Sequence, residues 1–261
     1  MTDPVTPKQA SFRAITQARL THGVRGQALD TASTLAFALD HARAREAVMS
    51  ELDAADMAKT FEALDLPNQS VRSAATTRDM FVQRPDLGRQ LPTDQNQGLK
   101  GIGPVDVALV LGDGLSAIAA SLNGPAFMAT LSGAISSLGW TASPVILAHN
   151  ARVALGDKIA QAIGAQTVVM ALGERPGLSA ADSLGVYITH RPQCDTADSA
   201  RNCISNIRED GLAVGAAAQQ ALALIEAMRA TNKSGVALSE VLALDAAKAP
   251  GIAPLSSQTK A

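Results

Sequence analysis

The stretch Val107-Ala-Leu-Val-Leu-Gly-Asp-Gly-Leu-Ser-Ala117 decides the fold of this 261-residue chain. It opens with five consecutive apolar residues, turns at Gly112-Asp113-Gly114 and continues into a segment that looks helical. An apolar run without a polar residue at every second position is typical of a strand buried on both faces. The stretch therefore predicts a strand-to-helix step in a parallel sheet covered by helices.

The same rhythm continues toward the C-terminus. Further short apolar runs alternate with helical stretches, the runs at 144–148, 167–172 and 185–189 and the stretches at 115–138, 155–163 and 214–230. The first of these helices is expected to break near Asn123-Gly124-Pro125. Because crossovers between parallel strands are right-handed, we predict an α/β fold with a doubly wound, mostly parallel Rossmann-like sheet over residues 99–249.

The residues before this sheet, 1–98, are expected to form a helical N-terminal domain. Apolar side chains recur at a rough helical spacing in residues 31–52, and shorter helices are expected at 57–64 and 71–81. The sequence of residues 91–98, Leu-Pro-Thr-Asp-Gln-Asn-Gln-Gly, is polar and indicates a linker to the sheet.

Composition excludes several classes of protein. Lysine plus arginine number 22 and aspartate plus glutamate 24, so the net charge of −2 provides no basic face for nucleic acid. Aromatic residues make up only 3%, which leaves little for base stacking. No stretch of about 18 apolar residues lacks a polar, Gly or Pro break, so no membrane span is expected. Without a secretory signal, the protein is expected in the cytoplasm, with a loose tail at 250–261.

Four loops are selected as the candidate site, because ligands of open parallel sheets bind outside the carboxyl ends of the strands. They are residues 112–117, 149–153, 173–178 and the segment after Thr189. These loops are far apart in the sequence, but the rule places them along one edge of the sheet.

The first loop, Gly112-Asp113-Gly114-Leu115-Ser116-Ala117, matches the pattern G-x-G-x-x-A between a strand and a helix. Its backbone N–H groups would face a dinucleotide phosphate, which makes a stand-alone nucleotide-binding oxidoreductase the alternative function. The acidic residue expected at the end of the next strand is absent, since Ala148-His149-Asn150 stand there. The other interpretation is a tight turn in which Ser116 caps the helix.

The later loops are rich in hydrogen-bonding groups. Glu174 would accept hydrogen bonds from a ligand, or instead form an ion pair with Arg175 or another cation. The run of residues 201–208, Arg-Asn-Cys-Ile-Ser-Asn-Ile-Arg, suits a polar ligand or a subunit surface. His149 is a candidate general base, with a structural role as the other interpretation. The two cysteines, Cys194 and Cys203, are expected to be reduced thiols. The residues alone thus predict a pocket for a large polar ligand.

Six motifs extend this prediction and occur in order along the chain, namely Arg84-Pro-Asp-Leu-Gly-Arg89, Asp113-Gly-Leu-Ser-Ala117, Arg152-Val-Ala-Leu-Gly-Asp157, Gly173-Glu-Arg-Pro-Gly-Leu178, Asp182-Ser-Leu-Gly-Val-Tyr-Ile-Thr189 and Arg201-Asn-Cys-Ile-Ser-Asn-Ile-Arg208. Together they resemble the light (small) subunit family of ethanolamine ammonia-lyase, an adenosylcobalamin-dependent enzyme. The resemblance covers nearly the whole chain.

The resemblance implies a cofactor-binding subunit without catalytic or metal-ligating residues of its own. In the family the small subunit binds the lower face and nucleotide tail of adenosylcobalamin, and a large TIM-barrel subunit binds ethanolamine. The cofactor's radical chemistry then yields acetaldehyde and ammonia. The family's cobalamin-contacting positions fall on Val153, Glu174 and Cys203. Further cofactor-binding residues are expected at Asp113, Gly114, Ser116, Arg152 and Arg175.

The resemblance also bears on the form of the cofactor and on assembly. Many cobalamin folds use D-x-H-x-x-G to replace the cofactor's own base on cobalt, and no histidine of this chain, whether His22, His41, His149 or His190, sits in that pattern. We therefore expect base-on cobalamin.

The helices of residues 1–98 are expected to dock on the large subunit in a hetero-oligomer; the other interpretation is that they only cover this chain's own sheet. The N-terminus is shorter than in enteric members, whose extra segment is linked to bacterial microcompartments, so packaging stays open. A non-enzymatic adaptor with an empty fold is a further alternative.

Overall fold

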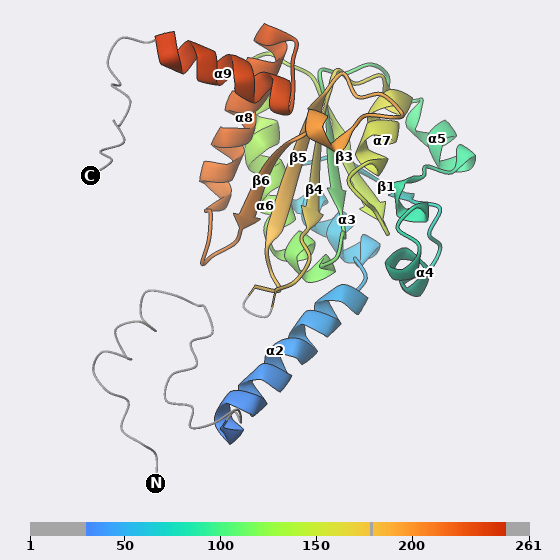
Figure 1. Ribbon diagram of the computed structural model, residues 1–261. Helices are drawn as coiled ribbons and strands as arrows, with labels where there is room; N and C mark the ends of the chain where they lie inside the picture. Colours follow the sequence, from blue (N-terminus) through green and yellow to red (C-terminus); the bar gives the residue numbers. More distant parts are fainter. Residues whose placement is uncertain (1–29, 178–179, 249–261) are drawn as a thin grey trace, which may run out of the picture.

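The computed structural model describes residues 30–177 and 180–248 and has a six-stranded sheet at its centre, in the order β1-β3-β2-β4-β5-β6 (Figure 1). The strands are β1 (Asn68–Arg72), β2 (Val107–Gly112), β3 (Ala142–His149), β4 (Thr167–Gly173), β5 (Leu184–His190) and β6 (Asn202–Ile207). The helices are α2 (Thr31–Met49), α3 (Ala54–Ala63), α4 (Arg78–Gln83), α5 (Thr93–Leu99), α6 (Ala117–Ser137), α7 (Leu155–Ile163), α8 (Val214–Thr231) and α9 (Val236–Lys248), with short 3-10 helices η1 (Leu87–Arg89) and η2 (Asp198–Ala200).

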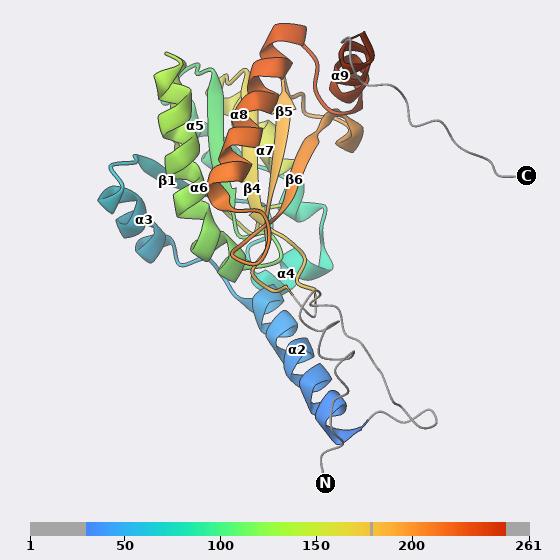
Figure 2. The same cartoon turned by 90° about the vertical axis from the view of Figure 1, so that its left-hand side faces the viewer.

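Helices cover both faces of the sheet, as the two views in Figures 1 and 2 show. Helices α3, α6 and α8 contribute to one buried apolar cluster, and α5 and α7 contribute to another on the opposite face. Along β2, Leu109 and Leu111 join the first cluster, whereas Ala108 and Val110 join the second. The strand is apolar throughout because its alternating side chains are buried on both faces.

The predicted alternation of strands and helices is confirmed from β2 to β4. The three pairings among β1, β3, β2 and β4 are all parallel. The helix predicted at 155–163 is α7, and it ends at Gly164, whose φ of +83° is the left-handed conformation that glycine favours at a helix end. The helices predicted at 31–52 and 214–230 are present as α2 and α8.

The prediction of a mostly parallel, doubly wound sheet is wrong beyond β4. Strand β5 pairs antiparallel with both β4 and β6, so the α/β fold has a mixed sheet. Only the ten residues 174–183 connect β4 to β5, whereas a parallel crossover needs about a dozen or more. The segment after Thr189 therefore leaves β5 at one end of the strands, and the other three candidate loops lie at the opposite end.

The N-terminal half is not purely helical, because β1 overlaps the helix predicted at 71–81. Of the strand's five residues only Val71 is buried, so the sequence shows no alternation of apolar and polar residues that would indicate a strand. The strand is defined by its parallel pairing with β3. The linker predicted at 91–98 is also wrong. Helix α5 occupies most of it and buries Leu99 in the cluster on the α7 face.

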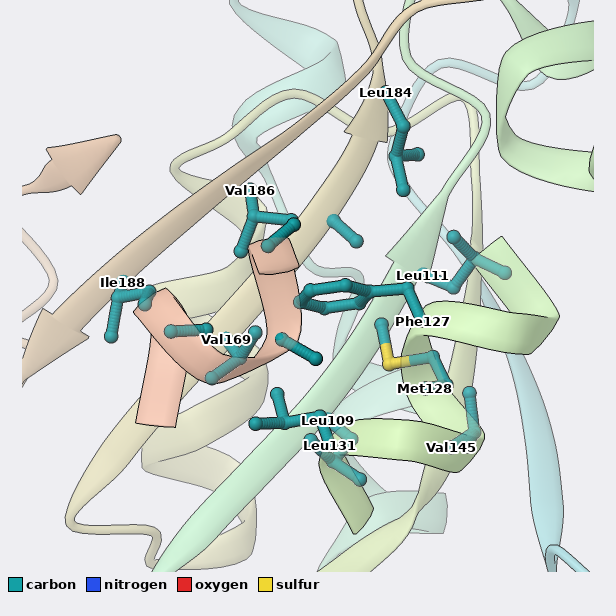
Figure 3. Close-up of a cluster of buried hydrophobic side chains, with 14 of the residues drawn as sticks. Leu109, Leu111, Phe127, Met128, Leu131, Val145, Val169, Leu184, Val186 and Ile188 are labelled. Carbon is teal, nitrogen blue, oxygen red and sulfur yellow. The ribbon is translucent and has the colours of Figure 1, made fainter. Parts of the chain in front are cut away.

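Helix α6 runs unbroken through the segment where a break was predicted. A Cβ on Gly124 would lie 2.6 Å from the side chain of Leu111, so glycine permits a close approach of α6 to β2. Pro125 is buried, and the cluster around Phe127 and Met128 in Figure 3 packs α6 against the sheet. Among the described helices α6 alone is long and apolar enough to cross a membrane, but nine of its residues are buried inside this protein.

Helix α2 projects away from the rest of the protein (Figures 1 and 2). Only Ala47 near its C-terminal end is buried, whereas Leu35 is 65% exposed and Leu39 is 51% exposed. These two apolar side chains are therefore largely open to solvent.

Candidate functional site

Two adjoining cavities lie beside α7 on the sheet face. The larger, about 370 Å³, is lined by Arg89, Arg152, Val153, Ala154, Tyr187, Asp198, Arg201 and Cys203. The smaller, about 240 Å³, is lined by Gly114, Leu115, Ala151, Arg152, Val153, Leu172, Gly173, Glu174, Arg175 and Tyr187. Because Arg152, Val153 and Tyr187 line both, the two cavities form one composite site.

The loop after β3 supplies the wall that both cavities share. The guanidinium of Arg152 lies 4.2 Å from the centre of the Phe81 ring and donates to the Phe81 carbonyl oxygen at 3.2 Å. Its Nε is buried and has no hydrogen-bond partner among the described residues. Burial lowers the pKa of Arg152, and the neighbouring cations Arg78, Arg89 and Arg175 lower it further. A buried N–H donor surrounded by cations suits an anionic or strongly accepting ligand.

The turn after β2 joins the ends of three strands. Asp113 is only 1% exposed, and its carboxylate accepts hydrogen bonds from the N–H groups of Asn150 at 2.8 Å and Ala151 at 3.0 Å. Gly114 has φ of +55°, and a Cβ there would collide with the carbonyl oxygen of Gly173. Glycine is therefore required for the turn to pack against β4.

The G-x-G-x-x-A pattern serves this turn rather than a dinucleotide. The N–H of Leu115 donates to the Gly173 carbonyl at 2.9 Å, and the N–H of Ser116 donates to the Asp113 carbonyl at 3.1 Å. The Ser116 hydroxyl accepts from the Ala119 N–H at 3.1 Å, which confirms Ser116 as the cap of α6. With these N–H groups engaged inside the protein, the oxidoreductase interpretation is not favoured.

Glu174 follows β4 and faces the smaller cavity. Its Oε2 accepts from the Ser183 hydroxyl at 2.5 Å and from the Asn206 N–H at 3.4 Å. Among the described residues it forms no ion pair with Arg175 or another cation. The interpretation of Glu174 as an ion-pair partner is therefore not supported. Glu174 instead presents a carboxylate acceptor beside the exposed Arg175 on the same cavity wall.

Neighbouring residues of β5 and β6, Tyr187 and Cys203, line the larger cavity. They are directly paired in the sheet register. Burial raises the pKa of Tyr187 to about 12, and Cys203 and Glu174 add to the rise. Cys203 is exposed, but partial desolvation raises the pKa of its thiol, although its hydrogen bond with Tyr187 opposes this. Both groups stay protonated at neutral pH, so Cys203 is suited to contact a ligand and not to attack one.

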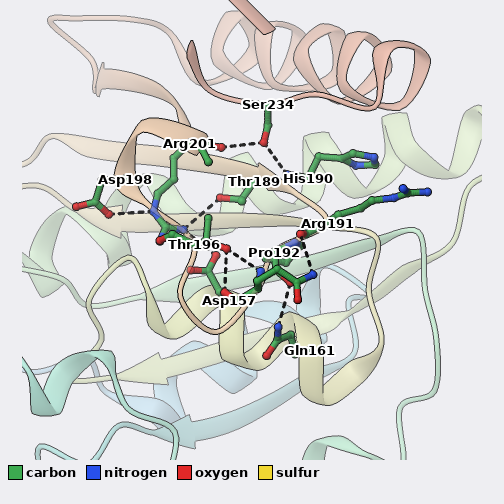
Figure 4. Close-up of polar contacts among 12 residues, drawn as sticks. Asp157, Gln161, Thr189, His190, Arg191, Pro192, Thr196, Asp198, Arg201 and Ser234 are labelled. Atoms are coloured by element: carbon green, nitrogen blue, oxygen red, sulfur yellow. Dashed lines mark hydrogen bonds and ion pairs between the residues drawn. The ribbon is translucent and has the colours of Figure 1, made fainter. Parts of the chain in front are cut away.

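Arg201, at the end of the loop that follows β5, lines the larger cavity. Figure 4 shows its polar contacts. Its guanidinium pairs with Asp157 of α7 at 2.7 Å and with Asp198 at 3.1 Å, and it donates to the Thr196 carbonyl at 2.9 Å. Burial alone would lower the pKa of Arg201, but the bonds to the two aspartates raise it. The loop 191–201 leaves β5 at the end of the strands opposite the other candidate loops. The ion pair between Arg201 and Asp157 holds this loop against α7, and there it reaches the cavity.

Most residues predicted for the site line the two cavities, namely Gly114, Arg152, Val153, Glu174, Arg175 and Cys203. Asp113 and Ser116 lie buried next to Gly114 and line neither cavity. Among the polar lining residues, Arg89, Tyr187 and Asp198 were not predicted as ligand contacts, whereas Arg201 belongs to the run 201–208 that was expected to suit a polar ligand. The only tyrosine of the chain, standing in an otherwise apolar strand, was a signal that could have identified one of them.

The described histidines stand apart from the site. His41 lies on α2, His149 ends β3 and His190 ends β5, and none lines either cavity. Burial lowers the pKa of His149, with Arg72 adding to this and Asp113 opposing it. Within residues 30–177 and 180–248 no group of three or more His, Cys, Asp or Glu could hold a metal ion.

These features define the class of the protein, an α/β protein with a composite cavity lined by cations, hydrogen-bond acceptors and apolar side chains. The family model described as "Ethanolamine ammonia-lyase light chain (EutC)" matches residues 7–239. The chain belongs to this family, which confirms the resemblance seen in its motifs.

Individual relatives agree over almost their full lengths. The ethanolamine ammonia-lyase small subunit of Ralstonia nicotianae is 42% identical over 239 residues, covering 90% of this chain and 88% of the relative. That of Xanthomonas campestris pv. campestris strain B100 is 39% identical over 248 residues, covering 92% and 91%. That of Pseudomonas fluorescens strain Pf0-1 is 40% identical over 244 residues, covering 91% and 89%.

Proposed function

We propose that this chain holds adenosylcobalamin as the small subunit of an ethanolamine ammonia-lyase complex. One observation carries the proposal. Val153, Glu174 and Cys203, the positions expected to contact cobalamin, come from three distant segments and line two adjoining cavities. The buried, unpartnered Nε of Arg152 in the shared wall supports a polar ligand at this place.

The lining residues fit the chemistry of this cofactor. Arg152 and Arg175 would favour the phosphodiester of the nucleotide tail, and Glu174 would accept hydrogen bonds from its amide side chains. Val153 and Tyr187 supply apolar contact, and Gly114 allows the backbone to approach closely. Asp113 and Ser116, both buried, would shape the turn and not touch the cofactor.

On this proposal the chain's residues bind and orient, and the substrate site belongs to the large TIM-barrel subunit. When bound, adenosylcobalamin supplies the radical chemistry that converts ethanolamine to acetaldehyde and ammonia. Tyr187 and Cys203 keep their protons at neutral pH because desolvation raises the pKa of each. They therefore contribute contact and exclusion of water, and neither side chain is assigned a role as acid, base or nucleophile.

We propose further that cobalt keeps the cofactor's own base. His41, His149 and His190, the histidines in the described part of the chain, line neither cavity. Electron paramagnetic resonance of the complex, prepared with ¹⁵N-labelled histidine, tests this. Superhyperfine coupling to a nitrogen of the protein would show that a histidine has replaced the base.

Binding of the cofactor is measured by mixing the purified chain with the large subunit and adenosylcobalamin. Visible absorption of cobalamin should co-elute with the complex on gel filtration. Glu174→Ala should weaken cofactor binding by about tenfold or more, because a hydrogen bond to a charged group contributes roughly 1.5–3 kcal/mol. Glu226→Gln, an exposed change on α8, is the matched control. Unchanged cobalamin affinity with lost turnover would contradict the role assigned to Glu174.

A further inference from the structure

A buried carboxylate holds the loop that forms the shared wall of the two cavities. Asp113 Oδ2 accepts from the Asn150 N–H at 2.8 Å, and Oδ1 accepts from the Ala151 N–H at 3.0 Å. The next two residues of the chain, Arg152 and Val153, line both cavities. The position of the wall therefore depends on a side chain that does not itself line the site.

The same carboxylate is tied to the projecting helix. Arg78 Nη1 pairs with Asp113 Oδ2 at 3.2 Å, and both side chains are nearly inaccessible to solvent. Arg78 Nε donates at 2.7 Å to the carbonyl oxygen of Val48, in the last turn of α2. One guanidinium thus joins the end of α2 to the turn after β2.

A second contact leads from Arg78 to the wall. Its guanidinium lies 4.6 Å from the centre of the Phe81 ring, and that of Arg152 lies 4.2 Å from the centre of the same ring. Cation–π contacts of desolvated guanidinium groups are among the stronger ones. Arg78 therefore reaches Arg152 both through Asp113 and through Phe81.

We propose that Arg78 and Asp113 are positioning residues that set the cofactor-binding wall at residues 151–153 and join it to the end of α2. The inference rests on the proposed function, since it takes the cavities as the cobalamin site. It also takes α2 as one of the helices of residues 1–98 that are expected to dock on the large subunit. An ion pair removed from water is sensitive to geometry, because each charge depends on its partner and on the remaining hydrogen bonds.

Two substitutions separate the two connections. Asp113→Asn keeps the size of the side chain but turns an amino group toward one of the two backbone N–H groups, which loses an acceptor. Arg78→Lys keeps a charge beside Asp113, but one ammonium lacks the fork that serves Asp113 and Val48 together. The exposed pair Arg84 and Asp86, 2.7 Å apart, provides matched controls in Arg84→Lys and Asp86→Asn.

Two measurements are made on each variant. Hydrogen exchange of the Asn150 and Ala151 amides is followed in the full chain, and the adenosylcobalamin dissociation constant is measured in the complex with the large subunit. We expect Asp113→Asn to accelerate exchange and weaken cofactor binding, each by about tenfold. Arg78→Lys should weaken binding by a smaller factor, and adding it to Asp113→Asn should weaken binding no further. The control variants should stay within about twofold.

Each outcome decides the inference. Cofactor affinity within twofold of the wild type in both variants, even with a lower melting temperature, would overturn it, because the pair would then only stabilise the fold. If Asp113→Asn does not fold, Arg78→Lys decides by the same criterion. Failure of the unmodified complex to bind cobalamin would refute the proposed function. In that case the positioning role is decided by hydrogen exchange alone, and unchanged exchange of the Asn150 and Ala151 amides in Asp113→Asn would refute it.

Discussion

At the residue scale, Cys203 illustrates how surroundings set the chemistry of a side chain. Its thiol lines the larger cavity, and partial desolvation raises its pKa. A raised pKa leaves less thiolate at any given pH, so alkylation is slowed. With Cys194 replaced by serine, we expect iodoacetamide to modify Cys203 with a midpoint above the ordinary thiol pKa, as followed by mass spectrometry across pH.

The cofactor provides the control for this prediction. Adenosylcobalamin together with the large subunit should protect Cys203 at every pH, because the thiol would be covered. A midpoint at or below the ordinary thiol pKa would contradict the desolvated environment described for Cys203. Equal alkylation rates with and without the cofactor would contradict its role in cofactor contact.

Gly114 is the residue where backbone geometry constrains the site most directly. Its φ is +55°, and a Cβ would collide with the carbonyl of Gly173. We expect Gly114→Ala to lower the free energy of unfolding in urea by more than about 1–3 kcal/mol, from strain and collision together. Gly133→Ala in α6, where a Cβ meets nothing within 4 Å, should instead be neutral or stabilise by about 0.5–1 kcal/mol. Equal effects of the two changes would exclude the collision.

Residues that directly follow apolar strands could be predicted from the sequence. Arg152 and Glu174 are examples, because the end of a buried strand is visible in the hydropathy pattern and fixes which side chains reach the sheet edge. Arg201 could not be placed in the same way. It reaches the cavity because its bonds to Asp157 and Asp198 hold a loop from the opposite end of the strands against α7. The contact with Asp157 joins residues far apart in the sequence, and no local pattern predicts it.

At the element scale, α2 is the proposed docking surface for the large subunit. Leu35 and Leu39 are exposed on a helix that projects from the body, and the Val48 carbonyl in its last turn accepts a hydrogen bond from Arg78. We expect Leu35→Asp with Leu39→Asp to weaken association with the large subunit at least tenfold, because burying two charges in an apolar contact is unfavourable.

Leu122 supplies the control for this experiment. It is 66% exposed on α6, so Leu122→Asp introduces one aspartate, half the charge of the double variant, at an equally open position outside α2. Analytical ultracentrifugation of each variant with the large subunit measures the association. Unchanged association of the α2 variant, or an equal loss with Leu122→Asp, would contradict docking through α2.

Two strands show what sequence periodicity could and could not predict among the elements. The apolar run of β5 identifies a buried strand, but an apolar run does not indicate whether the strand pairs parallel or antiparallel. Its antiparallel pairing was therefore not predicted. The short connection after β4 was the available signal. Strand β1 buries only Val71, and its pairing with β3 involves residues more than seventy positions away, which no local pattern encodes.

At the scale of the whole molecule, the antiparallel return explains where the cavities lie. In a doubly wound sheet a crossover helix would follow β4 and cover the next strand. Here the chain returns through ten residues instead, and the side chains of Tyr187 and Cys203 line an open cavity beside α7. The departure from the predicted fold thus creates the surface that is proposed to hold the cofactor.

The mixed sheet also joins the two halves of the chain, because β1 pairs with β3 across the division predicted at residue 98. Phe61 and Phe81, both fully buried, belong to the same first half. We therefore expect one cooperative urea transition, with coincident curves from far-UV circular dichroism and from the fluorescence of Trp140. A chain lacking residues 1–98 should not unfold cooperatively, since it loses a strand and core side chains. If that chain instead matched the full chain in stability, residues 1–98 would be a separate domain, as the sequence alone predicts.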